Sequence, residues 1–253
     1  MNKNHYSKNC IVYSNDGKIL QLEYAKKGAK KSKCSFGFSS GNHNVLFLID
    51  HKFKTTKSES NKIDIVSKNI AMLRSGIIGD GIYISGFIKQ KNYEYYYINK
   101  KFSPGSKITN DCSEVFSSKI FSLDDRPFGS NILFANFDLF GPNLTKVFIN
   151  GKKVDLIFFS QGLRSSKIYQ YLIQKFSILE YFSFDELFFW CLGLHLKLML
   201  LGTPNKFLHV YFKLGLVGKN TPFLFLTQKI KFFFLNNLIS FKKKLNKICS
   251  PFF

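Results

Sequence analysis

The stretch Tyr13–Ala25, with the sequence YSNDGKILQLEYA, joins a tight turn to the beginning of a helix. Its first half contains Asp16–Ile19 (DGKI), and Asp followed by Gly is typical of a turn because both residues tolerate turn backbone angles. The second half continues into Leu20–Lys31 (LQLEYAKKGAKK), where Leu20 and Tyr24 are four residues apart. That spacing predicts an amphipathic helix, which by its pattern alone would be an ordinary surface helix.

The rest of the chain alternates between groups of strands and pairs of helices. Apolar runs on both sides of a Gly-Asn turn predict a first β-hairpin over residues 34–53. A polar loop is expected over residues 52–61, so its first residues overlap the end of the hairpin. Strands are expected over 62–67 and 70–76, followed by helices over 80–97 and 106–121. From residue 130 we expect a strand, a Gly-Pro turn, a second strand and an Asn-Gly turn. Helices over 165–176 and 185–201 and strands over 210–219 and 223–228 complete the order. This order predicts one α+β domain with antiparallel sheets covered by helices, and it argues against a parallel βαβ array.

The composition is strongly biased, and the bias affects how the charge is interpreted. The 253 residues include 30 Phe but only four Ala, and only three of the 37 basic residues are Arg. Because Phe, Lys, Asn, Ile and Tyr have A/T-rich codons, we attribute the formal net charge of +21 to a biased genome. A basic nucleic-acid-binding protein is the alternative that this charge and 17% aromatic residues suggest. Specific phosphate and base recognition relies on the forked guanidinium of Arg, so we expect no nucleic-acid partner.

Several other classes of protein are not favoured. Residues 2–10 (NKNHYSKNC) lack the apolar core of a secretion signal. The longest apolar stretch, Leu187–Leu196, falls well short of the ~20 residues that span a bilayer, so we expect no membrane partner. The cysteines form no CxxC pair and the histidines show no ligand spacing, so we expect unpaired thiols in a reducing compartment, no metal and no cofactor. These residues are Cys10, Cys34, Cys112, Cys191, Cys249, His5, His43, His51, His195 and His209.

Tyr13–Ala25 resembles the N-terminal signature of proteasome α-type subunits, a Tyr/Phe-Ser-Pro-Asp-Gly-x3-Gln-x-Glu-Tyr-Ala pattern that leads into a helix. One position departs from this pattern, because Asn15 stands where the family usually has proline. Further matches follow in the order of the family, and the resemblance extends over about residues 4–226. These matches are Asp50 at the end of the first hairpin, Gly76 with Asp80 at the first long helix, Arg126-Pro127-Phe128-Gly129 before a strand, and Phe137-Asp138 with Gly141-Pro142.

Within that family, three shorter matches resemble the α type-1 subunit, at the position often called alpha-6. They are Asn4-x-Tyr6 near the beginning, Gly162-x-Arg164-Ser165 before a Tyr-rich helix, and Leu214–Lys219 (LGLVGK) near the end.

The resemblance implies the fold of the N-terminal-nucleophile hydrolases, a four-layer αββα sandwich of two antiparallel sheets flanked by helices. A single domain over 1–253 would comprise a gate segment (1–14), the signature turn and helix (15–32), the sandwich core (33–227) and a basic C-terminal helix or tail (228–253). The lysines and apolar residues of this tail would also suit a helix on a membrane surface. We favour a helix on the exterior of the protein.

The resemblance further implies a non-catalytic α-ring subunit of the 20S proteasome core, which acts in ring assembly, channel gating and docking of regulatory particles in ubiquitin-dependent protein degradation. Its partners would be other α subunits of a seven-membered ring, β-type subunits and the C-termini of regulatory particles, in the cytoplasm and nucleus. Enzymes of this fold require Thr or Ser at a freed N-terminus. Lys33 stands at that position, behind a helix, which disfavours the alternative of an active N-terminal-nucleophile hydrolase.

The resemblance also assigns roles to individual residues. Lys62 matches a lysine that receives the C-terminal carboxylate of activators, which a flexible ammonium can bind, although Ser32 replaces the glycine that usually shares this pocket. By composition alone Lys62 would be a solvated surface lysine. Where many members have Tyr-Asp-Arg in the gate segment, this chain keeps only the tyrosine. The gate residues are Tyr6, Ser7, Lys8 and Asp16. The ring-interface signature is Gln21, Glu23, Tyr24 and Ala25. The residues expected to be structural are Asp50, which is a turn residue at the end of a strand, and Gly76, Asp80, Arg126, Pro127 and Gly129.

Overall fold

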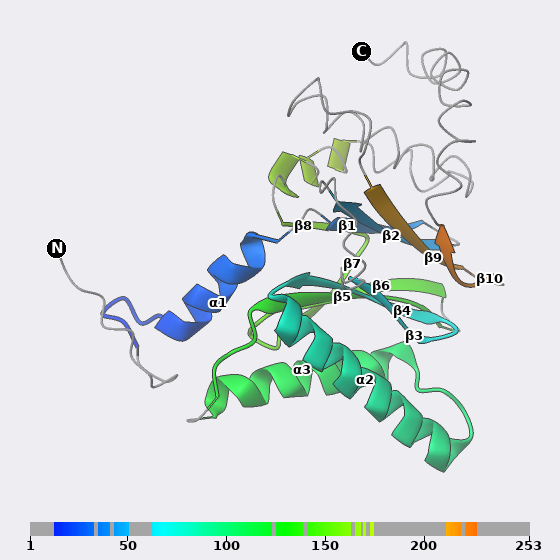
Figure 1. Ribbon diagram of the computed structural model, residues 1–253, viewed down its shortest axis with the longest axis horizontal. Coiled ribbons are helices and arrows are strands. Elements are labelled where there is room, and N and C mark those ends of the chain that lie inside the picture. The colour runs from blue at the N-terminus through cyan, green and yellow to red at the C-terminus, as the bar shows by residue number, and fades with distance from the viewer. Residues whose placement is uncertain are drawn as a thin grey trace, which may run out of the picture.

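Two antiparallel five-stranded sheets lie face to face in the computed structural model of the chain, with helices outside them (Figure 1). The α+β sandwich expected from the sequence is therefore confirmed. The structure describes residues 13–32, 35–40, 43–50, 62–122, 125–138, 141–162, 165–167, 169–170, 173–174, 211–218 and 221–226.

One sheet is a meander in which each strand pairs with the next along the chain, in the order β3-β4-β5-β6-β7. Alternate residues of its central strands point to opposite faces, and both faces are covered. Met72 of β4 and Phe134 of β5 are buried beneath the helices, whereas Leu73 and Leu133 are buried against the other sheet. The strands are β3 (Ile63–Ser67), β4 (Ile70–Gly76), β5 (Ser130–Asp138), β6 (Gly141–Val147) and β7 (Lys153–Leu156).

The other sheet combines distant parts of the chain, in the order β10-β9-β2-β1-β8. The β1–β2 hairpin is at its centre; β8 pairs with β1, and β9 pairs with β2. Phe159 of β8 and Val217 of β9 join the buried cluster between the two sheets. The strands are β1 (Ser35–Ser40), β2 (His43–Asp50), β8 (Phe158–Gln161), β9 (Tyr211–Gly218) and β10 (Thr221–Leu226).

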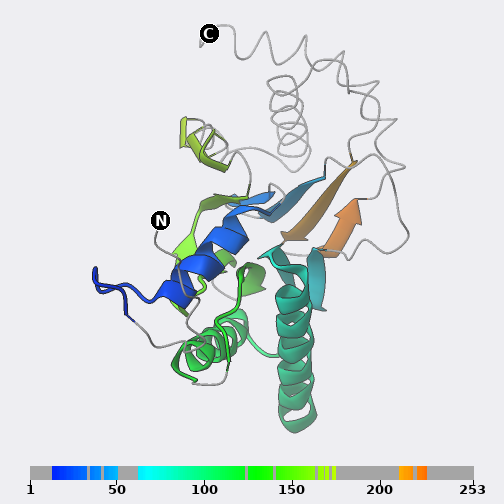
Figure 2. The ribbon, with the colours of Figure 1, turned by 60° about the vertical axis from the view of Figure 1, so that its left-hand side comes forward.

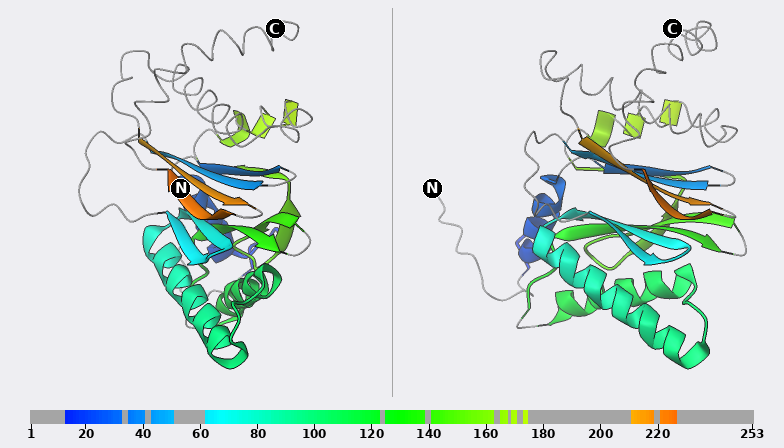
Figure 3. Two further views of the ribbon diagram at one scale, coloured as in Figure 1. Left: turned by 90° about the vertical axis from the view of Figure 1, so that its right-hand side faces the viewer. Right: turned by 45° about the vertical axis from the view of Figure 1, so that its right-hand side comes forward.

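Helices α2 (Ile78–Asn99) and α3 (Gly105–Phe121) cover the outer face of the meander sheet (Figure 3). Ile84 and Ile88 of α2 and Phe116 of α3 are buried there, as the apolar spacing predicts. The thiol of Cys112 is free and buried in the same layer, and burial raises its pKa. The other four cysteines lie outside the described residues.

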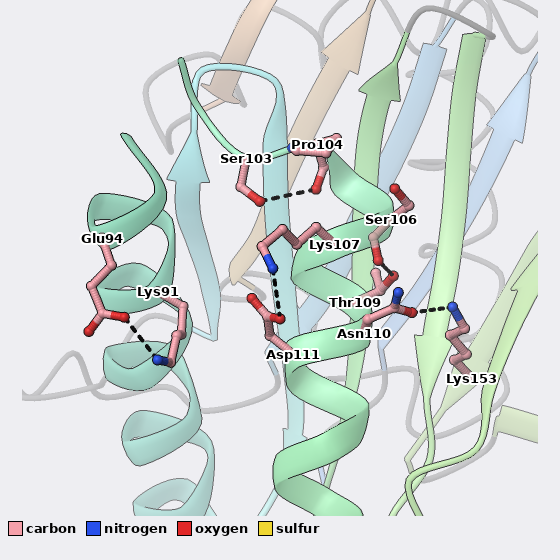
Figure 4. Close-up of polar contacts among 10 residues, drawn as sticks. All are labelled: Lys91, Glu94, Ser103, Pro104, Ser106, Lys107, Thr109, Asn110, Asp111 and Lys153. Atoms are coloured by element: carbon pink, nitrogen blue, oxygen red, sulfur yellow. Dashed lines mark hydrogen bonds and ion pairs between the residues drawn. The ribbon is translucent and has the colours of Figure 1, made fainter. Parts of the chain in front are cut away.

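Figure 4 shows one polar contact between α3 and the meander sheet, together with polar contacts within the helices. The ammonium of Lys153 on β7 donates to the side-chain oxygen of Asn110 on α3. Along the helices, Lys91 Nζ lies 2.8 Å from a Glu94 oxygen, but this ion pair is exposed and contributes little to stability.

The helix predicted from the signature is α1 (Leu20–Lys30), which packs on β4 and β5 at one end of the sandwich. Figure 2 brings α1 forward and shows it apart from the α2–α3 layer. Ala25 and Ala29 are buried against Ile149, and small side chains at these positions allow a close approach of the helix. A Cβ on Gly28 would lie 3.7 Å from Ile77, an ordinary contact.

Some elements differ from those expected. Gly141 and Pro142 do not form a turn but pair with Asp138 and Phe137 as the first residues of β6, where the missing N–H of proline is tolerated. The short strands β7 and β8 were not predicted. Of the helix expected over 165–176, the described residues are helical, and Tyr169 packs on Phe158 with ring centroids 5.3 Å apart. The helix expected over 185–201, the polar loop over 52–61 and the C-terminal tail lie outside the described residues.

Candidate functional site

The residues matched to the activator pocket surround one end of β4. Of the two, Lys62 lines a recess of about 10 Å³ there. Since a single water requires about 10–15 Å³, this chain alone provides space for no more than one water there. The recess is lined by Lys62, Arg74, Ser75, Gly76, Ile77, Ile78 and Gly81.

Ser32 and Lys62 reach this end of β4 from different elements. The backbone N–H of Arg74 donates to the carbonyl oxygen of Lys62 over 2.7 Å, which anchors the beginning of β3. Ser32 follows α1 and is buried, with its hydroxyl hydrogen-bonded to the hydroxyl of Ser75. The Ser32 side chain therefore points into the protein toward β4. An ion pair between Arg74 Nε and Asp64 Oδ2, 2.5 Å apart and largely buried, also joins β3 to β4.

The carboxylate of Asp80, in the first turn of α2, holds the chain segment that leads into β5. Arg126 donates to both oxygens of Asp80, at 2.9 Å from Nη1 and 2.6 Å from Nη2. The backbone N–H of Gly129 donates to the same carboxylate over 2.8 Å. The Asp80 hydrogen bond raises the pKa of Arg126. Asp80 is 8% exposed, whereas the Arg126 side chain is 58% exposed, so the buried N–H contact is the less screened of these interactions.

The glycines in this region are required by close backbone approach. Gly76 has φ of +130°, and a Cβ there would lie 2.2 Å from the carbonyl oxygen of Gly129. The N–H of Ile77 donates to that same oxygen over 3.0 Å. A Cβ on Gly129 would lie 2.4 Å from Ile77 Cδ1. Pro127 is buried between Arg126 and Gly129, so all members of the predicted structural set except Asp50 assemble into one junction between β4, α2 and β5.

The four residues of the expected ring-interface signature occupy different environments on α1. Ala25 is buried, and Gln21, Glu23 and Tyr24 are partly buried. Glu23 accepts a hydrogen bond from Lys26 over 2.7 Å, and this contact lowers its pKa. Ala25 therefore anchors the helix to the domain, whereas Glu23 belongs to the outer surface.

The turn before α1 forms with Asn15 in place of proline. Tyr13 and Ile19 make an antiparallel bridge, and Ser14 N–H donates to the Lys18 carbonyl over 2.8 Å. Gly17 has φ of +71°, which explains the glycine of the Asp-Gly pair. Asp16 is exposed on this turn. The other gate residues, Tyr6, Ser7 and Lys8, lie outside the described residues.

Lys33, at the position matched to a catalytic nucleophile, also lies outside the described residues. Ser35, two residues later, begins β1, and Asp50 is the last residue of β2. In the part of the chain that the structure describes, no group of His, Cys, Asp and Glu could hold a metal ion. No helix among those residues is long and apolar enough to cross a membrane.

Sequence reasoning missed a second cavity, of about 390 Å³, which is covered by α1. Lys146 of β6 and Gln161 of β8 line it. The available signal was Lys146 itself, since it follows Leu144 by two residues and therefore occupies an inward position of an alternating strand.

Comparisons with known proteins agree with the geometry. Residues 29–188 match a family described as "Proteasome subunit". The chain is 25% identical over 233 residues to "Proteasome subunit alpha type-1" of Trypanosoma brucei rhodesiense, covering 90% of this chain and 86% of the relative. It is 22% identical to the protein of the same name in Dictyostelium discoideum, covering 88% and 90%. It is 24% identical to "Proteasome subunit alpha type-6" of Saccharomyces cerevisiae, covering 68% and 74%.

Proposed function

Because this chain belongs to the proteasome subunit family, we propose that it is a non-catalytic α-ring subunit of the 20S proteasome core. The observation that carries the proposal is α1, which packs through Ala25 and Ala29 on the domain immediately before β1. An N-terminal nucleophile has to begin its chain at that point, because its own amine acts as the base. A folded and anchored helix upstream of β1 is incompatible with that chemistry.

The same proposal includes assembly with other α subunits in a seven-membered ring and with β-type subunits, whose threonines would carry out proteolysis. Glu23 and the exposed turn at Asp16 are on the surface and available for such contacts. Tyr6, Ser7 and Lys8 would belong to the segment that gates the channel. The setting would be ubiquitin-dependent protein degradation in the cytoplasm and nucleus.

Docking of regulatory particles is proposed at Lys62. A recess of about 10 Å³ is too small for the carboxyl end of a peptide, so a neighbouring subunit would have to complete the pocket. Ser32 supports this placement because its hydroxyl is bonded to Ser75. The serine therefore adds little bulk to the recess.

A native mass measurement on the assembly purified through a tag on this chain tests the proposal. We expect a particle that contains this chain together with other α-type and β-type subunits, and peptide hydrolysis that survives Lys33→Ala. The chain expressed alone should show no hydrolysis of fluorogenic peptides. Turnover by the isolated chain, or recovery of this chain with RNA and without other proteasome subunits, would contradict it.

A further inference from the structure

The 390 Å³ cavity lies at the end of the sandwich where α1 covers the space between the two sheets. Its walls come from α1, from the ends of β5 and β6 and from β8. Lys26 and Lys30 line it from α1, Asn131 from β5, Lys146 from β6, and Ser160 and Gln161 from β8. Gln161 pairs with Ser35, the first residue of β1.

Lys146 is an unusual residue for this position. It is 9% exposed, and its Nζ lies 4.0 Å from the ring centroids of both Phe148 and Phe159. Among the described ion pairs none involves Lys146, so the two rings are the contacts that partly compensate its charge. Burial lowers its pKa to about 8. A buried ammonium without a carboxylate is costly, and an anion from outside the chain would supply the missing partner.

Gln161 independently indicates a missing ligand. Its side chain is 6% exposed, and neither its amide nitrogen nor its amide oxygen has a hydrogen-bond partner within the described structure. Both atoms belong to a residue that lines the cavity. Buried amides are almost always hydrogen-bonded, because an unmade bond leaves their desolvation uncompensated.

We propose that this cavity binds a small organic anion that carries a phosphate or carboxylate group and a hydroxyl. Lys146, with Lys30 and the Glu23-paired Lys26 at the wall formed by α1, provides positive charge, and the described residues that line the cavity include no Asp or Glu. The amide N–H of Gln161 donates to an anionic oxygen, and its amide oxygen accepts from the hydroxyl. The volume falls within the range of about 300–1,000 Å³ that is usual for small-molecule sites.

The test measures amine reactivity in the purified particle that contains the full chain, at constant ionic strength. Each lysine is labelled with a limiting amine reagent at pH 8, and the modified peptides are quantified by mass spectrometry. The probes are glycerol phosphate and lactate, which carry a hydroxyl, with inorganic phosphate and acetate as simple anions. We expect a hydroxylated probe to reduce labelling of Lys146 about tenfold at ten times its Kd, as mass action requires. Lys153, which is bonded to Asn110 on the surface, is the internal control and keeps its labelling.

The pH dependence gives a second measurement on the unmodified protein. The ligand favours the charged form of Lys146, so its affinity is highest below pH 8 and falls up to about tenfold per pH unit above it. Among the residues that the structure describes, Lys26, Lys30 and Lys146 are the titratable groups that line the site, from α1 and β6.

Two variants separate the residues. Binding measured by equilibrium dialysis should be lost in Lys146→Met, weakened at least tenfold in Gln161→Leu, and unchanged in Lys153→Met. Preference for glycerol phosphate or for lactate identifies the anionic group. Protection by none of the four probes, or equal protection of Lys146 and Lys153, overturns the proposal, because the cavity then holds water only. Retained binding in Lys146→Met overturns it as well.

Discussion

Gly76→Ala should be among the most destabilising single-methyl changes in this chain. At φ of +130° a residue with a Cβ is strained by about 1–3 kcal/mol. The new methyl would also lie 2.2 Å from the Gly129 oxygen and 2.6 Å from Ser130 Cα, which are backbone atoms of the neighbouring segment and cannot rotate away. Relief requires β4 to move from β5 and breaks the bond from Ile77 N–H to Gly129, which contributes about 1 kcal/mol. We expect a loss of about 3 kcal/mol in the free energy of unfolding, after the smaller gain that Ala brings by restricting the unfolded chain.

The matched control is Gly86→Ala, in the exposed middle of α2, where an added Cβ meets nothing within 4 Å. Ala is favoured over Gly in a helix by about 1 kcal/mol, so this variant should be more stable than the unaltered chain. Urea unfolding of the full chain, followed by circular dichroism, measures both changes. If Gly76→Ala and Gly86→Ala unfold within 0.5 kcal/mol of each other, as surface substitutions do, the close approach at Gly76 is wrong.

Three further predictions concern other parts of the structure. Asp80→Ala should lower the free energy of unfolding, measured in urea, by about 2–3 kcal/mol because it removes the acceptor of the buried Gly129 N–H. Arg126→Ala should lower it by about 1 kcal/mol because the guanidinium is exposed, and equal losses would contradict this assignment. Cys112 should resist iodoacetamide in the folded chain at pH 8 and react in urea, because burial raises its pKa. Mass spectrometry measures the labelling, and rapid labelling of the folded chain would contradict the burial of Cys112 beneath the α2–α3 layer. Deleting Met1–Asn9 should raise peptide hydrolysis by the assembled particle without altering its subunit composition, and an unchanged basal rate would assign the closed gate to other subunits.

The sequence predicted the elements whose apolar period is long or whose turns are distinctive. α1, the first two strand pairs and the α2–α3 pair follow from such patterns. The comparisons confirm the proteasome family that Tyr13–Ala25 indicated, and they agree with the resemblance to α type-1 subunits that the shorter matches indicated. β7 and β8 escaped because each has only four residues, too few to establish a period of two. Gly141-Pro142 misled because this pair is common both in turns and at the first positions of a strand.

The site was only partly predictable, for a physical reason. Residue types can be matched one by one to a signature, but the distances that join Ser32, Lys62 and β4 depend on how α1 and two strands meet. Lys146 is on β6 of one sheet and Gln161 is on β8 of the other. The two residues therefore line the same cavity only when the two sheets are packed together. A local sequence pattern cannot show that, within the described structure, Lys146 forms no ion pair or that the side-chain amide of Gln161 makes no hydrogen bond.

The two sheets differ in when their strands leave the ribosome. All strands of the meander lie between Ile63 and Leu156, each beside its successor, so this sheet and its two covering helices can form while the chain is still being synthesised. The β1–β2 hairpin emerges first, and β8 can pair with β1 as soon as Gln161 has been made, but the partner of β2 comes last, because β9 begins at Tyr211. The edge of β2 therefore stays exposed through most of translation, in a chain rich in phenylalanine. A nascent chain stalled before residue 211 should bind chaperones through this hairpin, while its helix-covered half already resists protease.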